Sequence, residues 1–244
     1  MAGYDYKQGK ARIQNILDNT LEVIEQSKLP NDDNFTFDNA YHSWVTAVFV
    51  DIRDSTSLCS NEDKTKVSKV LRSFTSEVIE ILRDSDNLRE IGIRGDCVYA
   101  IYTTPTIDVV YGVTKKAFYV NTFMKMLNKL LLTRNLPSIS VGIGISTAQD
   151  LVIKAGRKNV GINSKVWIGK AVTKASNLSS LGNKNGVNSI VLSYSTYQNI
   201  ISLMLEKNND AKSWFKKINT DSSALQADII ISDFNSWILS GMPA

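Results

Sequence analysis

The stretch from Trp44 to Ile52 reads WVTAVFVDI, and it decides the fold class. It is short, rich in β-branched residues and almost continuously apolar, which is typical of a strand that is buried on both faces. Asp51 stands near its end, where a carboxylate costs free energy unless it is solvated, paired or bound to a metal ion. The stretch therefore predicts the centre of a sheet and a first functional side chain.

The chain beyond this strand alternates between helical and strand patterns. The order strand, helix, hairpin, helix, strand is the βαββαβ succession of an α+β, ferredoxin-like sandwich, with extra C-terminal strands and a helix. Leu151–Ala155 is expected to be the hairpin partner of the strand Ile139–Ser146. The other expected elements are helices over Ser60–Arg83, Thr106–Thr133, Gly169–Leu181 and Ser195–Leu205, and strands over Leu88–Ile93, Cys97–Tyr102, Ser189–Leu192 and Ala224–Ile231.

The chain divides into an N-terminal helical extension, residues 1–40, and a main domain, residues 41–244. A helix is predicted from Tyr6 to Leu29, ended by Pro30 and the polar run after it. We expect it to pack on the domain or on a second copy of the chain. Its apolar residues recur at three- and four-residue steps, namely Ile13, Ile16, Leu17, Leu21 and Ile24.

Composition excludes several classes of protein. With 244 residues, 43% hydrophobic and 21% charged, the chain is ordinary globular protein and not disordered. No apolar run approaches the roughly 18 residues of a membrane span, and the N-terminus lacks the apolar core of a secretory signal. Two cysteines form no disulfide framework or zinc motif. These features predict a cytoplasmic protein. The single histidine, His42, argues against a histidine metal site or a Ser-His-Asp triad.

The charge distribution predicts a partner that carries phosphate. The net charge is only +4, but the stretch from Leu151 to Leu205 contains no acidic residue. Such a block attracts nucleic acid, an anionic lipid surface or a nucleoside triphosphate, and a solvated basic face is the plain alternative. Few aromatic residues interleave with it, so nucleic acid is disfavoured. Its basic residues are Lys154, Arg157, Lys158, Lys165, Lys170, Lys174 and Lys184.

Two carboxylates, Asp51 and Asp96, are candidates for a metal site. Taken singly, Asp51 suits the start of a turn or helix and Asp96 suits a hairpin turn. In a βαββαβ sheet, however, the end of the first strand and the turn of the following hairpin lie at the same edge. Two carboxylates that meet there repel each other unless a cation lies between them, and hard divalent ions suit such oxygen ligands. The loop that follows, with Ile52, Arg53, Ser55 and Thr56, could surround phosphate oxygens with its backbone N–H groups.

Four segments in order resemble the class III nucleotidyl cyclase homology domain: FVDIRDST (49–56), IGIRGDCVYAIY (91–102), VGIGIST (141–147) and WIGKAVTKASNLSSLG (167–182). The resemblance covers roughly Trp44 to Tyr197. It implies that Asp51, Asp96 and the backbone carbonyl of Ile52 hold two Mg²⁺ or Mn²⁺ ions. It also implies a head-to-tail homodimer with sites built from both subunits.

The implied reaction turns a nucleoside triphosphate into a 3′,5′-cyclic nucleotide and pyrophosphate. One ion lowers the pKa of the ribose 3′-hydroxyl and the other binds the triphosphate. The 3′-oxygen then attacks the α-phosphorus in line. No protein nucleophile is needed, which agrees with the lack of a triad.

The departures from the family pattern concern base reading and transition-state stabilisation. The two purine-reading positions of the family fall on Gly92 and Val166, and its transition-state Asn and Arg fall on Thr173 and Asn177. This pattern resembles the Pycsar pyrimidine cyclases of bacterial antiphage defence, which make cyclic UMP or cyclic CMP as a signal for a co-encoded effector. UTP is favoured over CTP. The alternatives are a purine cyclase with atypical base reading and a non-catalytic nucleotide-binding domain.

Residues on the expected helix after Gly169 are candidates for the missing functions. Lys170, Thr173, Lys174 and Asn177 share one face at helical spacing and suit a triphosphate. A solvated surface face is the alternative, and for Lys174 the two interpretations are balanced.

The base pocket has its own candidates. Arg94 lies two residues before Asp96 and can bind a pyrimidine carbonyl, although an exposed turn arginine is the alternative. Phe49 points the same way as Asp51 and could form a wall of the pocket, although core packing is common for a strand Phe. Trp167 could be a core anchor or a wall of the pocket, and the core is favoured. Cys97 is expected to be a small buried hydrophobic residue of the core.

Overall fold

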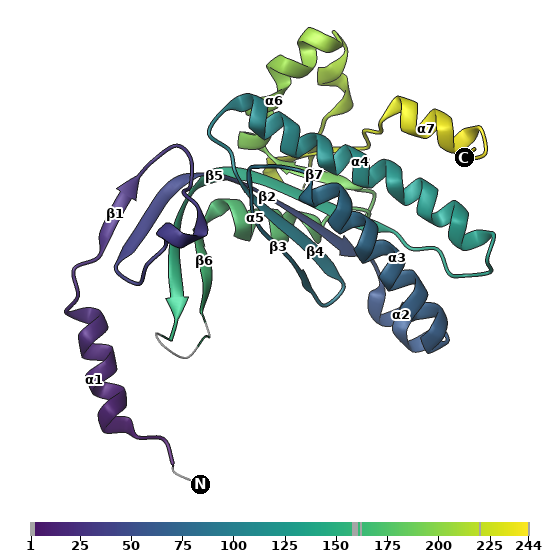
Figure 1. The fold of residues 1–244 in the computed structure, drawn as a ribbon. Coiled ribbons are helices and arrows are strands. Elements are labelled where there is room, and N and C mark those ends of the chain that lie inside the picture. The colour runs from purple at the N-terminus through teal and green to yellow at the C-terminus, as the bar shows by residue number, and fades with distance from the viewer. Residues whose placement is uncertain (1–2, 158–160, 162, 220, 244) are drawn as a thin grey trace.

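The computed structural model describes residues 3–157, 161, 163–219 and 221–243 (Figure 1). They form a nine-stranded sheet in the order β3-β4-β2-β5-β7-β9-β8, with β1 paired to β2 and β6 paired to β5. The strands are β1 Glu22–Glu25, β2 Asn39–Ile52, β3 Leu88–Arg94, β4 Cys97–Thr103, β5 Val141–Gly156, β6 Asn163–Gly169, β7 Ile190–Ser193, β8 Lys216–Ile218 and β9 Asp221–Ala227. The helices are α1 Tyr6–Leu17, α2 Ser55–Asn61, α3 Lys64–Arg83, α4 Ile107–Leu132, α5 Lys170–Ser179, α6 Tyr194–Lys207 and α7 Ser232–Leu239, with short 3-10 turns η1 Asp32–Asn34 and η2 Ala211–Trp214.

The predicted βαββαβ core is confirmed. It consists of β2, α3, β3, β4, α4 and β5. The strand β2 is antiparallel to β4 on one side and to β5 on the other, and β3 lies outside β4. This is the ferredoxin-like strand order. The strand predicted from Trp44 is therefore the centre of the sheet, and it begins earlier, at Asn39.

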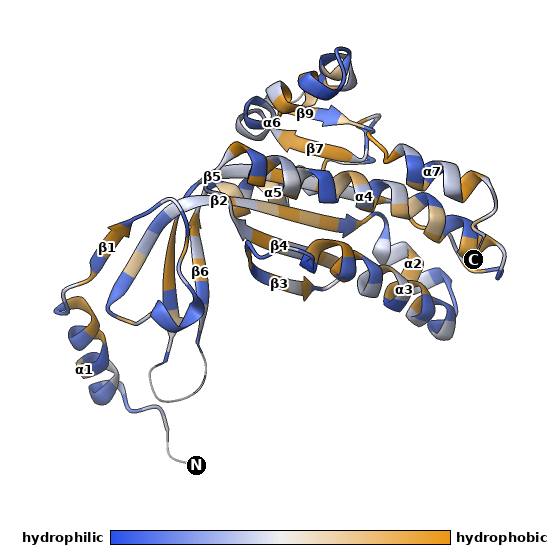
Figure 2. Ribbon diagram, turned by 45° about the horizontal axis from the view of Figure 1, so that its top comes forward, coloured by the Kyte–Doolittle hydropathy of each residue, from blue (hydrophilic) through white to orange (hydrophobic). Residues whose placement is uncertain are grey.

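The two faces of the sheet are covered differently. On one face, Val48 and Val50 of β2 pack into the main core with Phe74 of α3 and Phe123 of α4. On the other face, α5 and the segment after β1 form a smaller core around Val45, Ala47 and Leu29. Figure 1 shows α3 and α4 on one side of the sheet and α5 on the other, and in Figure 2 the strands between these layers are largely coloured as hydrophobic.

Two glycines allow α5 to lie directly on β5. A Cβ atom at Gly142 would lie 2.0 Å from the carbonyl oxygen of Ser179, and one at Gly144 would lie 2.0 Å from that of Ala175. Side chains at these positions would force the helix away from the strand. The glycines of the VGIGIST segment therefore set the height of α5 above the sheet.

The predicted helix from Tyr6 to Leu29 is wrong in its second half. The helix α1 ends at Leu17, and β1 then pairs in parallel with the start of β2. The reason is tertiary: β2 offers an open edge, and its backbone groups pair with the β-branched run around Val23 and Ile24. The extension, residues 1–40, is thus a helix followed by a strand.

The apolar residues of the predicted N-terminal stripe mostly do not pack on their own domain. Ile24 packs against the smaller core. The other four, Ile13, Ile16, Leu17 and Leu21, are between 49% and 76% exposed, and α1 projects away from the body of the protein (Figure 1). Packing of α1 on a second copy stays a prediction.

Two other predicted elements need correction. Leu151–Ala155 is not a hairpin partner but the continuation of β5, which pairs with β2 without interruption from Val141 to Ile153. The segment after Ser146 contains no glycine or proline to turn the chain, and the true partner is β6. The predicted helix Ser60–Arg83 is two helices, because Asp63 caps α3 by accepting hydrogen bonds from the N–H groups of Thr65 and Lys66 at 2.9 and 3.2 Å.

The C-terminal elements follow the prediction with shifted bounds. The predicted last strand, Ala224–Ile231, corresponds to β9, which ends at Ala227 and leads to α7. The short strand β8 beside it was missed, because three residues carry no readable period. Within the described part of the chain, no helix has the length and apolar character that crossing a membrane requires.

The N-terminal segment divides into a dispensable part and a structural part. Deletion of residues 1–20 should leave the free energy of unfolding within about 0.5 kcal/mol of the full chain, since α1 buries almost no apolar surface. Deletion of residues 1–38 should cost several kcal/mol, since Leu29 and Phe35 are only 1% and 3% exposed and each contributes about 1.5–3 kcal/mol. Urea unfolding of the three proteins at low concentration checks this. Equal losses in both deletions would contradict the assignment.

Candidate active site

Asp51 lies where β2 leaves the sheet. It pairs with Cys97 of β4 and with Gly142 of β5, on the face that α5 covers. Its carboxylate forms an ion pair with Arg53. The Arg53 guanidinium also donates to the backbone carbonyls of Asp51 and Ser180, at 3.2 and 3.0 Å. Arg53 therefore joins the end of β2 to the C-terminal end of α5.

The second predicted carboxylate, Asp96, lies in the β3–β4 turn at the same edge. Gly95 before it has a left-handed backbone, φ 63°, which a tight turn requires. Burial raises the pKa of the Asp51 carboxyl above its ordinary value, Arg53 opposes this, and the nearby Asp96 carboxylate raises it further. The two carboxylates thus lie close enough at one edge of the sheet to influence each other.

The donor set at this edge fits a hard divalent cation. It offers oxygen ligands, namely the two carboxylates and the adjoining backbone carbonyls of β2, and the two negative charges repel each other in a half-buried place. The Ile52 side chain is buried on the opposite face of the sheet, so only the backbone carbonyl of this residue could be a metal ligand. In the described ranges, no group of three or more His, Cys, Asp and Glu side chains forms a cluster that could hold a metal ion.

Cys97 is half-buried beside Asp51, so its expected place in the core is wrong. It is the first residue of β4 and pairs with Asp51 of β2. Burial, followed by the Asp51 carboxylate, raises the pKa of its thiol to about 12. The thiol therefore stays neutral at physiological pH and offers no nucleophile.

An aromatic pair stands next to the carboxylates. The sheet register places Gly92, Tyr99, Phe49 and Gly144 in one row across β3, β4, β2 and β5. The rings of Phe49 and Tyr99 stack with centroids 5.3 Å apart, and both side chains are half-buried. A Cβ atom at Gly92 would lie 2.8 Å from the Tyr99 ring. Tyr99 therefore fills the space above Gly92.

Glu90 ties this aromatic pair to β6. Its carboxylate accepts hydrogen bonds from the Tyr99 hydroxyl at 2.9 Å and from the Trp167 indole N–H at 2.8 Å. Burial and then the bond to Glu90 raise the pKa of Tyr99. Trp167 packs against the smaller core, as predicted. Sequence reasoning missed both Tyr99 and Glu90, although strand alternation from Cys97 places Tyr99 on this face.

Arg94 and Val166 lie on exposed parts of the same region. Arg94 pairs with Cys97, so it shares the face of Phe49 and Asp51, and its charge is close enough to lower the pKa of Tyr99. Val166 on β6 is 40% exposed and faces away from Trp167. In the described chain, Arg94 is thus placed to reach the aromatic pair and Val166 is not.

The predicted polar face of α5 exists, but it lies apart from the carboxylates. Lys170, Thr173, Lys174 and Asn177 line one open hollow of about 490 Å³, together with Asp221 and Ser223 of β9. Lys174 donates to the carbonyl and the hydroxyl of Ser223 at 3.1 and 2.6 Å. Neither Asp51 nor Asp96 lines this hollow. One chain therefore presents two separate halves of the predicted site.

The structure also shows where the predicted phosphate-binding loop after β2 and the basic block lie. Ser55 and Thr56 lie in the first turn of α2, whose N-cap residue Asp54 has φ 53° and accepts no hydrogen bond from the helix with its side chain. In the basic block, Lys165 pairs with Asp32 at 2.7 Å and Lys154 donates to the Phe35 carbonyl at 3.2 Å. These two lysines hold the strand β6 region to the N-terminal segment instead of forming one phosphate surface. Lys158 lies outside the described residues.

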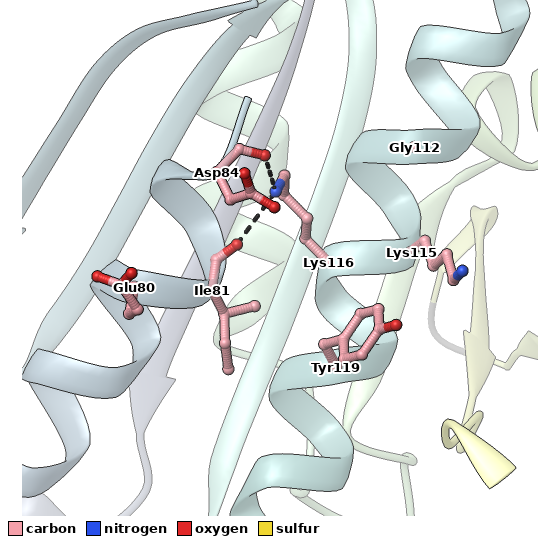
Figure 3. Close-up of a pocket in the computed structure, with 7 residues that line it drawn as sticks. All are labelled: Glu80, Ile81, Asp84, Gly112, Lys115, Lys116 and Tyr119. Atoms are coloured by element: carbon pink, nitrogen blue, oxygen red, sulfur yellow. Dashed lines mark hydrogen bonds between the residues drawn. The ribbon is translucent and has the colours of Figure 1, made fainter. Parts of the chain in front are cut away.

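A hollow of about 400 Å³ between α3 and α4 is unrelated to this site (Figure 3). Lys116 reaches from α4 to the end of α3 and donates to the carbonyls of Ile81 and Asp84. Desolvation lowers its pKa. Lys116 therefore satisfies the open carbonyls at the C-terminus of α3, a structural function.

Comparisons with known proteins identify the family of the chain. Residues 37–216 match the family described as the adenylate and guanylate cyclase catalytic domain. The chain is 55% identical over 240 residues to a uridylate cyclase of Treponema porcinum, covering 98% of this chain and 82% of that one. It is 30% identical over 192 residues to a uridylate cyclase of Gulbenkiania mobilis, covering 74% and 73%.

Solved structures share the fold at low identity. The adenylyl cyclase CyaB from P. aeruginosa superimposes with a TM-score of 0.61 at 19% identity, over 77% of this chain and 95% of that one. A class III adenylyl cyclase-like ATP-binding protein from Pseudomonas aeruginosa gives a TM-score of 0.68 at 15% identity, over 95% and 48%.

The contact between Gly92 and Tyr99 yields a prediction about stability. Gly92→Ala should destabilise the protein by about 1–3 kcal/mol, because the added methyl group meets the Tyr99 ring. In a Tyr99→Ala background the same change should be close to neutral, since the ring is gone. Urea unfolding of the four proteins measures this coupling. Gly112→Ala, where nothing lies within 4 Å, is the control. Additive effects would show that the two positions do not compete for space.

Proposed function

The chain belongs to the class III nucleotidyl cyclase family, and from that membership we propose that it is a pyrimidine cyclase that converts UTP, ahead of CTP, into the 3′,5′-cyclic nucleotide and pyrophosphate. The observation that carries the choice of base is the stack of Tyr99 on Phe49 above Gly92. This stack leaves no space for a purine-reading side chain at Gly92 and narrows the pocket toward a one-ring base. The relatives named uridylate cyclase support the same choice.

In this proposal Asp51, Asp96 and the carbonyl of Ile52 hold two Mg²⁺ or Mn²⁺ ions. Bound there, the ions supply Lewis acidity toward the ribose 3′-hydroxyl and neutralise charge on the triphosphate. The raised pKa of Asp51 and its repulsion from Asp96 support a site that is completed by cations.

The protein groups position the substrate. The ribose 3′-oxygen forms a bond to the α-phosphorus while the bond from that phosphorus to the bridging oxygen of the β-phosphate breaks. Pyrophosphate leaves with that oxygen, and the 3′-hydroxyl proton passes to solvent. Lys170, Lys174, Thr173 and Asn177 of a second copy contact the phosphates and stabilise the charge that develops on them. Arg53, Ser55 and Thr56 bind the phosphates from the side of the carboxylates.

Base recognition falls to Arg94 and the aromatic pair. The Arg94 guanidinium donates to the carbonyl oxygens of the base. Uracil offers two such carbonyls and cytosine one, so UTP is the better substrate. A site that depends on such polar contacts discriminates strongly, because a wrong base leaves buried groups unpaired.

The wider setting of the proposal is antiphage defence in the cytoplasm. The cyclic nucleotide would act as a signal for a co-encoded effector that senses it. The engagement of Lys154 and Lys165 with the N-terminal segment argues against a continuous nucleic-acid surface over the basic block. The presence of two free cysteines agrees with a reducing compartment.

The substrate is tested with a nucleotide panel. Initial rates on UTP, CTP, ATP and GTP at equal concentration with Mn²⁺ should follow the order UTP, CTP, then the purines. Arg94→Ala should cut turnover of UTP by about 10- to 100-fold, the usual effect of losing a charged hydrogen bond. Arg72→Ala, an exposed arginine on α3, is the control. A purine as the fastest substrate would refute the proposed pyrimidine preference but would not contradict the proposed cyclase activity. Nucleotide binding without pyrophosphate release would indicate a non-catalytic domain.

The two-chain site is tested by mixing inactive variants. Asp51→Ala, like Asp96→Ala, should abolish turnover without unfolding the protein. Lys170→Ala/Thr173→Ala/Asn177→Ala should be inactive for a different reason. In an equal mixture about half of the dimers are mixed, and each has one intact site, so about a quarter of the wild-type activity should return. No recovery, with mixed dimers demonstrated by mass spectrometry, would place each site within one chain.

A further inference from the structure

Asp150 on β5 is a carboxylate buried where no reaction step needs it. Its side chain is 0% exposed, which is rare for Asp unless a partner compensates the charge. Within the described part of the chain, no Lys, Arg or His lies within ion-pair distance of it. Ser43, directly opposite on β2, is also fully buried and its hydroxyl has no partner among the described residues. The compensation must therefore come from the backbone.

The backbone partners are the first amides of α5. The Asp150 carboxylate accepts from the N–H of Ala171 at 3.1 and 3.2 Å and from the N–H of Val172 at 3.4 Å. The N-cap residue of α5 is Gly169, which has no side chain to do this. A carboxylate at a helix N-terminus satisfies open N–H groups and interacts favourably with the helix dipole. A neighbouring strand thus supplies the cap of α5.

Gly169 provides the space that the Asp150 carboxylate occupies. The two residues pair directly across β5 and β6, and a Cβ atom on Gly169 would lie 2.0 Å from the Asp150 Oδ1 atom. Only glycine leaves room for the carboxylate to reach the helix. At its other end α5 is held by the Arg53 bond to the Ser180 carbonyl, at 3.0 Å. The helix is therefore fixed at both ends by charged side chains from the sheet region.

We propose that Asp150 is a positioning residue that fixes α5 and so sets where Lys170, Thr173 and Asn177 meet the triphosphate. The proposal rests on the proposed function, because those three side chains matter only if α5 faces a nucleotide. Lys170 directly precedes the capped amides, and Thr173 and Asn177 follow one and two turns later. A small rotation of the first turn moves all three relative to the phosphates, and displacements near 1 Å cost about 100-fold in rate.

The main variant is Asp150→Asn, which keeps the shape but removes the charge and one acceptor. It should lower kcat on UTP by about 10- to 100-fold and change KM by less than about threefold, because the displaced side chains of α5 act mainly on the transition state. The amides of Ala171 and Val172 should exchange hydrogen for deuterium faster. Gly169→Ala should reproduce both effects. Asp63→Asn makes the same charge-removing change at the N-cap of α3, outside the site, and should leave kcat unchanged.

Mixtures of variant chains distinguish a positioning defect in α5 from a general loss of structure. Asp150→Asn chains mixed with Asp51→Ala chains should recover activity, because the defects lie in different halves of the site. Mixed with Lys170→Ala/Thr173→Ala/Asn177→Ala chains they should recover none. Recovery in the second mixture and none in the first would overturn the proposal, as would wild-type kcat and wild-type amide exchange in Asp150→Asn.

Failure of the proposed function gives a different result. A wild-type protein without turnover of any nucleotide overturns the cyclase proposal, and the exchange measurement then still decides whether Asp150 fixes α5. Unchanged exchange at Ala171 and Val172 overturns the positioning assignment, and faster exchange confined to α5 supports it.

Discussion

The pairing of β2 with β4 on one side and with β5 on the other is the constraint on which the rest of the structure depends. The near-continuous apolar run after Trp44 gives this central strand two apolar faces, and a core covers each of them. The same register brings the end of β2, the β3–β4 turn and the C-terminal end of α5 to one place. Asp51, Asp96 and Arg53 meet there as a consequence of strand pairing.

The unequal cover of the two faces explains where chemistry is possible. The helices α3 and α4 close one face with a continuous apolar core, whereas α5 covers only part of the other. Phe49 and Tyr99 are left half-buried beside the carboxylates, an arrangement that costs stability in a single chain. The polar face of α5 points elsewhere, toward β9. The proposed two-chain site would bring these two regions together from different copies of the chain.

Close contacts across the sheet set the local geometry of these two regions. Tyr99 is compatible with its neighbours because Gly92 has no side chain, and Asp150 reaches α5 because Gly169 has none. In each pair one position is a glycine, and the side chain of the other residue occupies the space that a Cβ atom would take. In the first pair, the Tyr99 ring leaves no room for a side chain at position 92. In the second pair, the buried Asp150 carboxylate lies against the N-terminus of α5, where backbone N–H groups compensate its charge.

The sequence by itself determined the strand and helix periods of the core, the strand order and the edge at which Asp51 and Asp96 meet, because apolar periodicity and turn residues are local signals. The face shared by Lys170, Thr173 and Asn177 was predictable for the same reason. Only the tertiary structure decided that α1 stops at Leu17 and that β5 continues through Leu151. It also decided that Tyr99 and Glu90 are hydrogen-bonded beside the candidate site and that Lys174 is bound to Ser223. These features depend on an open strand edge, on cross-strand register and on contacts between residues far apart in the chain, and such contacts leave no period in the sequence.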